Sequence, residues 1–200
     1  RDRFGVKPLY YARPSGTDPL NLELDSGAEG LLFSSEIKGL LATEAVSDAL
    51  DWRAQMDLIT LTYTPGPQTV IAAIAQVPSG SWMRWTPEGI ERGTYWTPNL
   101  APLPTPPSFK QATRHLRDLL CASVEERLVS DVPVGLFLSG GVDSTALLYA
   151  ASEVSSAPLN TFTVKFSERD FDESDYARRA AKAFGAHHHE ELITPHPDEF

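Results

Sequence analysis

The residues with the clearest potential for chemistry form a short loop of serines, glycines and one aspartate. The loop is Ser139-Gly140-Gly141-Val142-Asp143-Ser144. It follows an apolar, strand-like run, residues 134–138, and leads into a helix-like run, residues 144–151. The free N–H groups and the dipole at a helix N-terminus favour an anion, and glycines let the backbone approach that anion closely. The loop therefore predicts a phosphate-binding site.

The loop lacks the lysine that a Walker-type phosphate loop requires. Such a loop ends in Lys-[Ser/Thr], whereas Asp143 precedes Ser144 here. A carboxylate beside a phosphate is repelled unless a cation lies between them, so Asp143 indicates Mg²⁺ bound to a polyphosphate. This arrangement suits release of pyrophosphate after attack at the α-phosphorus, rather than transfer of the γ-phosphate. The alternative is an ordinary strand-to-helix turn, in which glycines supply the bend and Ser or Asp caps the helix.

Alternating strand and helix patterns continue after the loop. A strand-like, a helix-like and a second strand-like segment follow at residues 159–166, 173–184 and 189–193. Asp170 and Asp172 are candidates to cap the helix, and Gly185 is a candidate to end it. The order strand, helix, strand, helix predicts a parallel sheet with right-handed crossovers. A ligand is then expected at the carboxyl ends of the strands, where Ser139 lies.

The first half of the chain has a different pattern, of short strands, short helices and turns. Strand-like segments flank a loop rich in Gly, Pro and Asp at residues 14–30. Residues 35–41 and 51–61 have the spacing of amphipathic helices. Two alternating segments around a turn at residues 86–89 predict a hairpin with a four-residue loop.

A proline-rich stretch separates the two halves. Five of residues 97–107 are proline, a composition that favours an extended linker. Ser108 and Gln111 then form a capping-box pattern at the start of a long helix. One apolar face of this helix is marked by Phe109, Ala112, Leu116, Leu119, Leu120, Val124 and Leu128. We expect one domain over residues 1–97, a linker over 98–107 and a second domain over 108–200.

Composition narrows the class of protein and of partner. The 200 residues are 42% hydrophobic and 22% charged, which is typical of globular domains. A net charge of −10 without a basic patch argues against a nucleic-acid partner. The single Cys121 and the lack of any apolar run near the ~18 residues of a membrane span predict a cytoplasmic protein without a membrane partner. Because the chain starts at Arg1, inside sequence with the pattern of a folded domain, we expect it to be a piece of a longer chain.

Three other groups could carry chemistry, and each has a simpler structural interpretation. Cys121 lies within the long helix with no adjacent base, as expected of a half-buried core residue rather than a nucleophile. The three histidines at residues 187–189 alternate sides on an extended segment, which disfavours a shared metal ion. The carboxylates of residues 168–175 could bind a cation, but acidic residues are common at a solvated helix start.

Further short motifs occur in a fixed order on both sides of the loop. They are Arg1-Asp2-Arg3-Phe4-Gly5-Val6-Lys7-Pro8-Leu9-Tyr10, Phe33-Ser34-Ser35-Glu36-Ile37-Lys38, Ser130-Asp131-Val132-Pro133-Val134-Gly135, Thr161-Phe162-Thr163-Val164, Asp172-Glu173-Ser174 and His188-His189-Glu190. With the Ser139 loop, their order and spacing resemble the glutamine-hydrolysing asparagine synthetase family along the whole chain. Each motif alone has low specificity, but their collinearity makes an ordinary turn at Ser139 a poor explanation.

The resemblance implies an α/β fold with an α+β N-terminal part. Residues 1–97 resemble the end of a class II glutamine amidotransferase domain, which has an antiparallel sheet. Residues 108–200 resemble the start of an ATP-pyrophosphatase synthetase domain, which is adenine nucleotide alpha hydrolase-like and has a parallel βαβ sheet. In this family ATP and Mg²⁺ are used to adenylate the side-chain carboxylate of aspartate, with release of pyrophosphate. Ammonia from glutamine then displaces AMP to give asparagine, and members commonly form homodimers.

The resemblance also assigns roles to individual residues. The pyrophosphate loop corresponds to Ser139, Gly140, Gly141, Asp143 and Ser144, with Asp143 as the Mg²⁺ ligand. Leu138 and Val164 correspond to positions that hold the adenosine part of ATP. An apolar residue at the end of each parallel strand could flank a purine, which agrees with the pattern read from the residues.

The chain also departs from the family pattern. The family's glutaminase nucleophile is a cysteine at the mature N-terminus, and no cysteine precedes Cys121 here. A second segment rich in glycine and aspartate, which completes the family's ATP site, is expected beyond Phe200. Lys165 stands where the family commonly has glycine. We therefore expect no complete catalytic site, and no net activity, from these 200 residues alone.

Two other functions stay open. A relative that adenylates another carboxylate, such as a β-lactam-forming or macrolactam-forming synthetase, would share the loop. A non-catalytic chain that acts only by association would use apolar surface residues, for which Trp82, Trp85 and Trp96 are candidates, although tryptophans more often lie in a core. The flanking sequences and a titration with ATP and Mg²⁺ would separate these functions.

Overall fold

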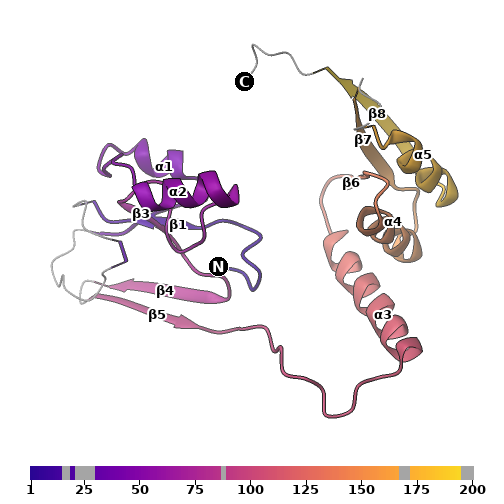
Figure 1. Cartoon of the computed structure of the whole chain (residues 1–200), viewed down its shortest axis with the longest axis horizontal. Helices are drawn as coiled ribbons and strands as arrows, with labels where there is room; N and C mark the ends of the chain where they lie inside the picture. Colours follow the sequence, from indigo (N-terminus) through magenta and orange to yellow (C-terminus); the bar gives the residue numbers. More distant parts are fainter. Residues whose placement is uncertain (15–18, 21–29, 87–88, 167–171, 195–200) are drawn as a thin grey trace. The chain divides into compact units, whose positions relative to one another are not determined.

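The computed structural model describes residues 1–14, 19–20, 30–86, 89–166 and 172–194. The chain divides into two compact units, Arg1–Ala101 and Pro102–Phe200 (Figure 1). The division falls within the proline-rich stretch, where the backbone forms little regular secondary structure. Each unit has its own sheet and its own buried core.

The first unit contains a small antiparallel sheet of three strands. Its strands are β1 (Tyr10–Ala12), β2 (Leu32–Ser34) and β3 (Ile74–Gln76), in the order β2-β1-β3. Tyr11 of the central strand pairs with Phe33 on one side and with Ala75 on the other. The predicted loop at residues 14–30 falls largely outside the described residues, and the strands on either side of it are paired.

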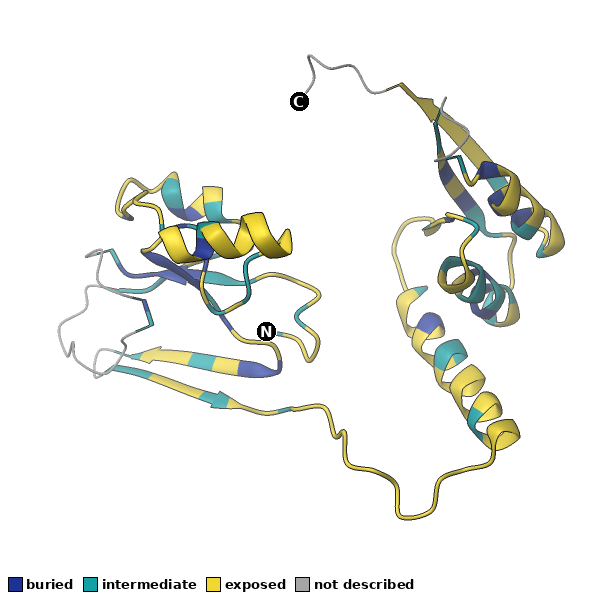
Figure 2. Ribbon diagram, in the orientation of Figure 1, coloured by how far each residue is buried: buried dark blue, intermediate teal, exposed yellow. Residues whose placement is uncertain are grey.

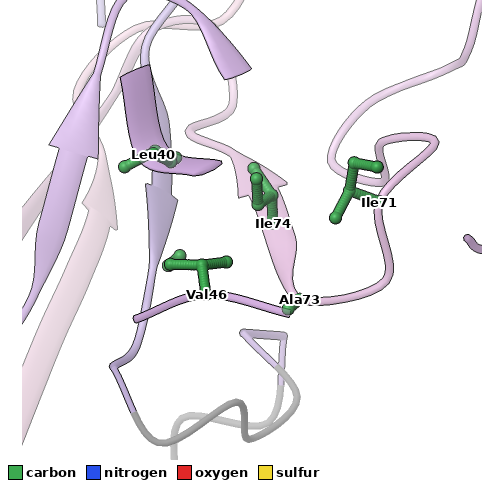
Figure 3. Packing of buried hydrophobic residues seen from close by; sticks show 6 residues of the cluster. Leu40, Val46, Ile71, Ala73 and Ile74 are labelled. Carbon is green, nitrogen blue, oxygen red and sulfur yellow. The ribbon is translucent and has the colours of Figure 1, made fainter. Parts of the chain in front are cut away.

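Helices cover one face of this sheet. They are α1 (Ile37–Leu41) and α2 (Trp52–Leu61), close to the predicted segments. The Asp51 side chain caps α2 by accepting the N–H groups of Arg53 and Ala54. The core between helix and sheet is centred on Leu40 and Ile74, with Val46, Ile71 and Ala73 around them (Figure 3).

The opposite face packs against a hairpin. The hairpin strands are β4 (Ser81–Thr86) and β5 (Gly89–Thr94), and Met83 packs beside Tyr11 of the sheet. The prediction of a four-residue loop at residues 86–89 was wrong, because Thr86 pairs directly with Gly89. Cross-strand pairing thus extends each strand by one residue, and Pro87 and Glu88 lie outside the described residues.

The second unit contains a parallel sheet, as predicted. Its strands are β6 (Gly135–Phe137), β7 (Asn160–Phe166) and β8 (His187–Ile193), in sequence order. They alternate with α4 (Val142–Val154) and α5 (Ser174–Ala183). Gly185 ends α5 with φ +66°, the left-handed conformation expected of that position. With the antiparallel unit, this establishes the mixed α/β class.

Helix α3 (Phe109–Arg127) opens this unit with the predicted capping box. The Ser108 side chain accepts the Gln111 N–H, and the Gln111 side chain accepts the Ser108 N–H. Its predicted apolar face is buried only near the C-terminal end, where Val124 packs on Ala150 and Ala151 of α4. Most of the rest of α3, including Phe109 and Leu116, is exposed (Figure 2).

The core beside the loop is small. Leu138 and Leu148 pack with Ala177 and Ala181, so the end of the first parallel strand lies against α4 and α5. The N-cap of α5 is Glu173 rather than Asp172, although Asp172 accepts the Ser174 N–H just before the helix, and Asp170 lies outside the described residues. None of the helices in the described parts of the chain has both the length and the apolarity needed to cross a bilayer.

Candidate functional site

The serine- and glycine-rich loop connects β6 to α4. Gly141 is the N-cap of α4, and Val142 begins the helix. The Ser139 and Ser144 hydroxyl oxygens are 3.1 Å apart, and Ser144 also donates to the Gly141 carbonyl oxygen at 3.2 Å. These contacts join the two ends of the loop. The first N–H groups of α4 have no partner within the helix and are available to an anion.

The start of the loop is fixed to the neighbouring strand. The Leu138 N–H donates to the Phe162 carbonyl oxygen at 2.8 Å, and the Thr163 hydroxyl donates to the Leu138 carbonyl oxygen. Leu138 and Thr163 are both buried. Because both backbone groups of Leu138 are held by β7, the chain leaves the sheet at a defined point, with Ser139 exposed immediately after it.

The glycine in the middle of the loop contacts helix α5. Gly140 has φ +81°, in the left-handed region that favours glycine. A Cβ atom on Gly140 would lie 2.6 Å from the Tyr176 Cβ and 2.7 Å from the Ala177 nitrogen. The first turn of α5 therefore lies directly against the loop, and no larger residue fits at Gly140 without movement.

A pocket of about 390 Å³ lies beside the loop, at the carboxyl ends of β6 and β7. It is lined by Phe137, Leu138, Ser139, Phe162, Thr163, Val164, Phe166 and Glu173. The pocket brings together three of the residues singled out from the sequence, Leu138, Ser139 and Val164. It is mainly apolar, as a purine site requires.

The other residues singled out do not line the pocket but continue from it along the same loop. Gly140 and Gly141 follow Ser139, and Asp143 and Ser144 are in the first turn of α4. The Asp143 carboxylate is exposed and makes no hydrogen bond or ion pair with the described part of the chain. No group of three or more metal-ligating side chains occurs among the described residues, so Asp143 would supply a single protein ligand to a cation.

The larger pocket of the first unit is a weaker candidate. Its volume is about 670 Å³, and Asp51, Arg53 and Asp57 are its charged lining residues. The Asp51 carboxylate is already used to cap α2, so it is not free for a ligand. The described residues that line this pocket also include no glycine-rich loop that could bring backbone N–H groups to an anion.

The three consecutive histidines have structural roles. Strand β8 begins at His187, two residues earlier than predicted, because Asn160 and Thr161 of β7 pair with His187 and His188. The His188 Nδ1 atom is 2.9 Å from the Thr161 hydroxyl oxygen, and the His189 ring stacks on Phe162 with centroids 5.0 Å apart. Lys165 lies in regular strand geometry within β7 and pairs with Leu192.

An ion pair joins α5 to β8. Arg178 donates two hydrogen bonds of 2.8 Å to the two carboxylate oxygens of Glu190. These bonds lower the pKa of the Glu190 carboxyl group, and the nearby His188 adds to that effect. Cys121 is half-buried where α3 packs on α4, which confirms its predicted role as a core residue.

Sequence reasoning missed two residues of this site. Thr163 was part of a recognised motif but had no separate role, and Glu173 was interpreted as part of a solvated helix start. The signal for Thr163 was a hydroxyl on a buried strand next to the strand that carries the loop. Local sequence gives no signal for Glu173, because its position in the pocket depends on how α5 packs.

Comparison with known families gives two adjacent matches. Residues 1–96 match the Glutamine amidotransferase domain model, and residues 115–198 match the Asparagine synthase model. The chain is 33% identical over 196 residues to asparagine synthetase [glutamine-hydrolyzing] 1 of Bacillus subtilis, covering 98% of this chain and 28% of that protein. Along its whole length the chain is similar to asparagine synthetases. The Ser139 loop lies in the part that matches the Asparagine synthase model.

Two further relatives of the asparagine synthetase family match nearly all of the chain. Asparagine synthetase [glutamine-hydrolyzing] 3 of Bacillus subtilis is 28% identical over 209 residues, covering 97% of this chain and 32% of that protein. A putative asparagine synthetase [glutamine-hydrolyzing] of Mycobacterium tuberculosis H37Rv is 34% identical over 207 residues, covering 100% of this chain and 29% of that protein. The chain thus spans less than a third of the length of each of these three relatives.

Proposed function

We propose that the chain is part of an ATP-dependent ligase that makes asparagine from aspartate, with ammonia from glutamine as the nitrogen source. The observation that carries this proposal is the Ser139–Ser144 loop, which opens beside an apolar pocket at the carboxyl ends of two parallel strands. The loop lies within the match to the Asparagine synthase model. The names of the relatives support asparagine as the product and glutamine as the substrate that is hydrolysed.

The side chains around the loop fit ATP and Mg²⁺. Leu138 and Val164 would hold the adenosine part in the apolar pocket, next to Phe162. The Ser139 and Ser144 hydroxyls and the N–H groups that open α4 would hold the pyrophosphate part. The Asp143 carboxylate, free of protein partners in the described chain, would bind Mg²⁺. When bound, ATP would supply an electrophilic α-phosphorus and a pyrophosphate leaving group.

The residues of the loop favour reaction at the α-phosphorus. A γ-phosphoryl transfer site uses a lysine to reach the terminal phosphates, and the loop has Asp143 where a P-loop has lysine. The hydroxyls of Ser139 and Ser144 would remain hydrogen-bonded to pyrophosphate as negative charge develops on it. The protein thus stabilises the departing group rather than a transferred one.

We propose that residues 1–97 belong to the glutaminase part, 98–107 form the linker and 108–200 belong to the synthetase part. The only cysteine, Cys121, packs between two helices of the second unit and is not placed to be a glutaminase nucleophile. A complete site would need residues outside these 200, which on their own are expected to lack net activity. A cytoplasmic homodimer without nucleic-acid or membrane partners completes the proposal.

Substitution of Asp143 tests the proposed function in the full-length protein. Asp143→Ala should abolish aspartate-dependent release of pyrophosphate, because it removes the carboxylate of the loop itself, while glutamine hydrolysis persists. Pyrophosphate release and glutamate formation would be measured in parallel. Asp118→Ala, which removes an exposed carboxylate from α3, is the matched control.

Three results would count against the proposal. Full pyrophosphate release by Asp143→Ala would remove the role assigned to Asp143. Release that depends on another carboxylate, but not on aspartate, would favour a relative that closes lactam rings. An absence of ATP binding in calorimetric titration with Mg²⁺ would favour a non-catalytic chain.

A further inference from the structure

Glu173 lies at the start of α5 and reaches the pocket beside the loop. It is the one charged residue among the eight described residues that line this pocket. The Thr163 hydroxyl is already bound to the Leu138 carbonyl oxygen and the Ser139 hydroxyl to Ser144, so Glu173 is the described lining residue whose polar side-chain group makes no hydrogen bond. A carboxylate at an apolar pocket has few uses other than binding a hydrogen-bond donor or a cation.

The backbone of Glu173 is fixed, while its side chain is free. Its carbonyl oxygen accepts the N–H groups of Tyr176 and Ala177 at 3.0 and 3.3 Å. The next residue, Ser174, is 1% exposed and donates its N–H to Asp172. The Glu173 side chain makes no cap hydrogen bond and no ion pair with the described residues. Glu173 thus lines the pocket from an exposed position, and the described part of the fold makes no use of its carboxylate.

The same turn of α5 touches the phosphate loop. Gly140 lies so close to Tyr176 and Ala177 that a Cβ atom would overlap both. Glu173 is thus between two parts of one site, the apolar pocket and the loop. The packing of α5 alone gives Glu173 this position.

The ribose of a nucleotide is a good partner for this carboxylate. A phosphate would repel it, and an apolar purine face gives it no hydrogen bond. The ribose joins base to phosphate and carries two hydroxyl donors. A carboxylate that accepts ribose hydroxyls is a known solution in other nucleotide-binding sheets. Such hydrogen bonds to a charged acceptor are stronger than neutral ones.

We propose that Glu173 binds the ribose of the nucleotide by accepting hydrogen bonds from its hydroxyl groups. This inference rests on the proposed function, because it takes ATP as the occupant of the pocket. It adds a sugar-recognition residue to the site and explains why α5 starts against the loop. Glu173 would then select ribonucleotides over nucleotides that lack these hydroxyls.

A thermodynamic cycle with ATP and 2′,3′-dideoxy-ATP, each with Mg²⁺, tests this in the full-length protein. The unsubstituted protein should bind dideoxy-ATP about 10- to 100-fold more weakly than ATP. Glu173→Ala should weaken ATP binding by a similar factor and leave dideoxy-ATP binding unchanged. Glu173→Gln, which keeps an acceptor oxygen without its charge, should fall in between.

Controls separate this inference from the proposed function. Glu126→Ala, at an exposed position of α3, should bind both nucleotides as the unsubstituted protein does. Circular dichroism would verify that each variant is folded. ATP binding in which Glu173→Ala keeps the full preference for ATP over dideoxy-ATP would overturn the role of Glu173 alone. No binding of either nucleotide by the unsubstituted protein would overturn the proposed function and this inference together.

Discussion

Two polar segments, the Arg1–Lys7 turn of the first unit and the Ser139–Ser144 loop of the second, use similar residues in opposite ways. In the first, the Asp2 carboxylate accepts the N–H groups of Phe4, Val6 and Lys7. The Arg1 guanidinium donates to the carbonyl oxygens of Gly5, Lys7 and Val77. Every strong polar group of this pair is therefore bound to backbone.

The loop of the second unit leaves its strongest polar group free. Asp143 has no partner among the described residues, and the Ser139 and Ser144 hydroxyls are bonded chiefly to each other and to the loop. An aspartate bonded to its own turn stabilises the fold, whereas an aspartate left exposed beside free N–H groups is available to a ligand. The two carboxylates therefore differ in what each has left for a ligand.

The largest effect should come from the glycine at the centre of the loop. Gly140→Ala forces a side chain into the left-handed region and against Tyr176, so the free energy of unfolding should fall by about 3 kcal/mol. ATP binding by the full-length protein should weaken about tenfold or more, because the loop must move. Urea unfolding of the 200-residue chain, followed by far-ultraviolet circular dichroism, measures the first effect and calorimetric titration the second.

A matched glycine separates backbone strain from contact. Gly185 also has a positive φ, of +66°, but a Cβ atom there would have no neighbour within 4 Å. Gly185→Ala should therefore cost only about 1 kcal/mol and leave ATP binding unchanged. Equal losses in the free energy of unfolding from Gly140→Ala and Gly185→Ala would mean that the contact between the loop and α5 contributes nothing to stability.

An intermediate effect is expected from Arg1, whose role is in the fold. Arg1→Met keeps an unbranched, flexible stem but leaves three carbonyl oxygens without a donor, and should destabilise the first unit by about 2 kcal/mol. All four tryptophans of the chain lie in this unit, so tryptophan fluorescence during urea unfolding reports on it selectively.

The control for this prediction is Arg3→Met, at an exposed arginine in the same turn. It should leave both stability and nucleotide binding unchanged. If Arg1→Met impaired ATP binding as strongly as Gly140→Ala, the distinction between a structural turn and a ligand loop would fail.

Features set by local chemistry were predicted well from the sequence. The capping box at Ser108 and Gln111 located the start of α3 to the residue, because both partners lie within one turn. The parallel sheet followed from the alternation of strand and helix, and the place of Ser139 beside the pocket followed from the carboxyl ends of the strands. These inferences needed only neighbours in sequence and general rules of topology.

Features set by packing were not predicted. Histidines are weak strand formers, so β8 appeared to start at His189, but pairing with β7 extends it to His187. The apolar pattern of α3 did not predict that most of the first half of the helix would be exposed. Such a pattern shows which face a helix could bury, and not whether another element covers that face. Glu173 belongs to the pocket only because α5 packs against Gly140, a contact between distant positions.

The smallest effect should come from the Asp2 carboxyl group, and it is visible only in the pH dependence of stability. The amide N–H of Lys7, followed by that of Val6, holds the pKa of Asp2 below its ordinary value. A carboxyl group with a lowered pKa in the folded state contributes stability above its unfolded pKa, near 4, and loses it as the pH falls through the lower folded value. Unfolding followed by tryptophan fluorescence from about pH 6 to pH 2 should therefore show a decline below about pH 4, with a shallower slope in Asp2→Asn. If the unsubstituted protein and Asp2→Asn showed equal slopes, the hydrogen bonds that the turn donates to the Asp2 carboxylate would contribute no stability. Asp2 would then differ from Asp143 only in geometry and not in what it does for the fold.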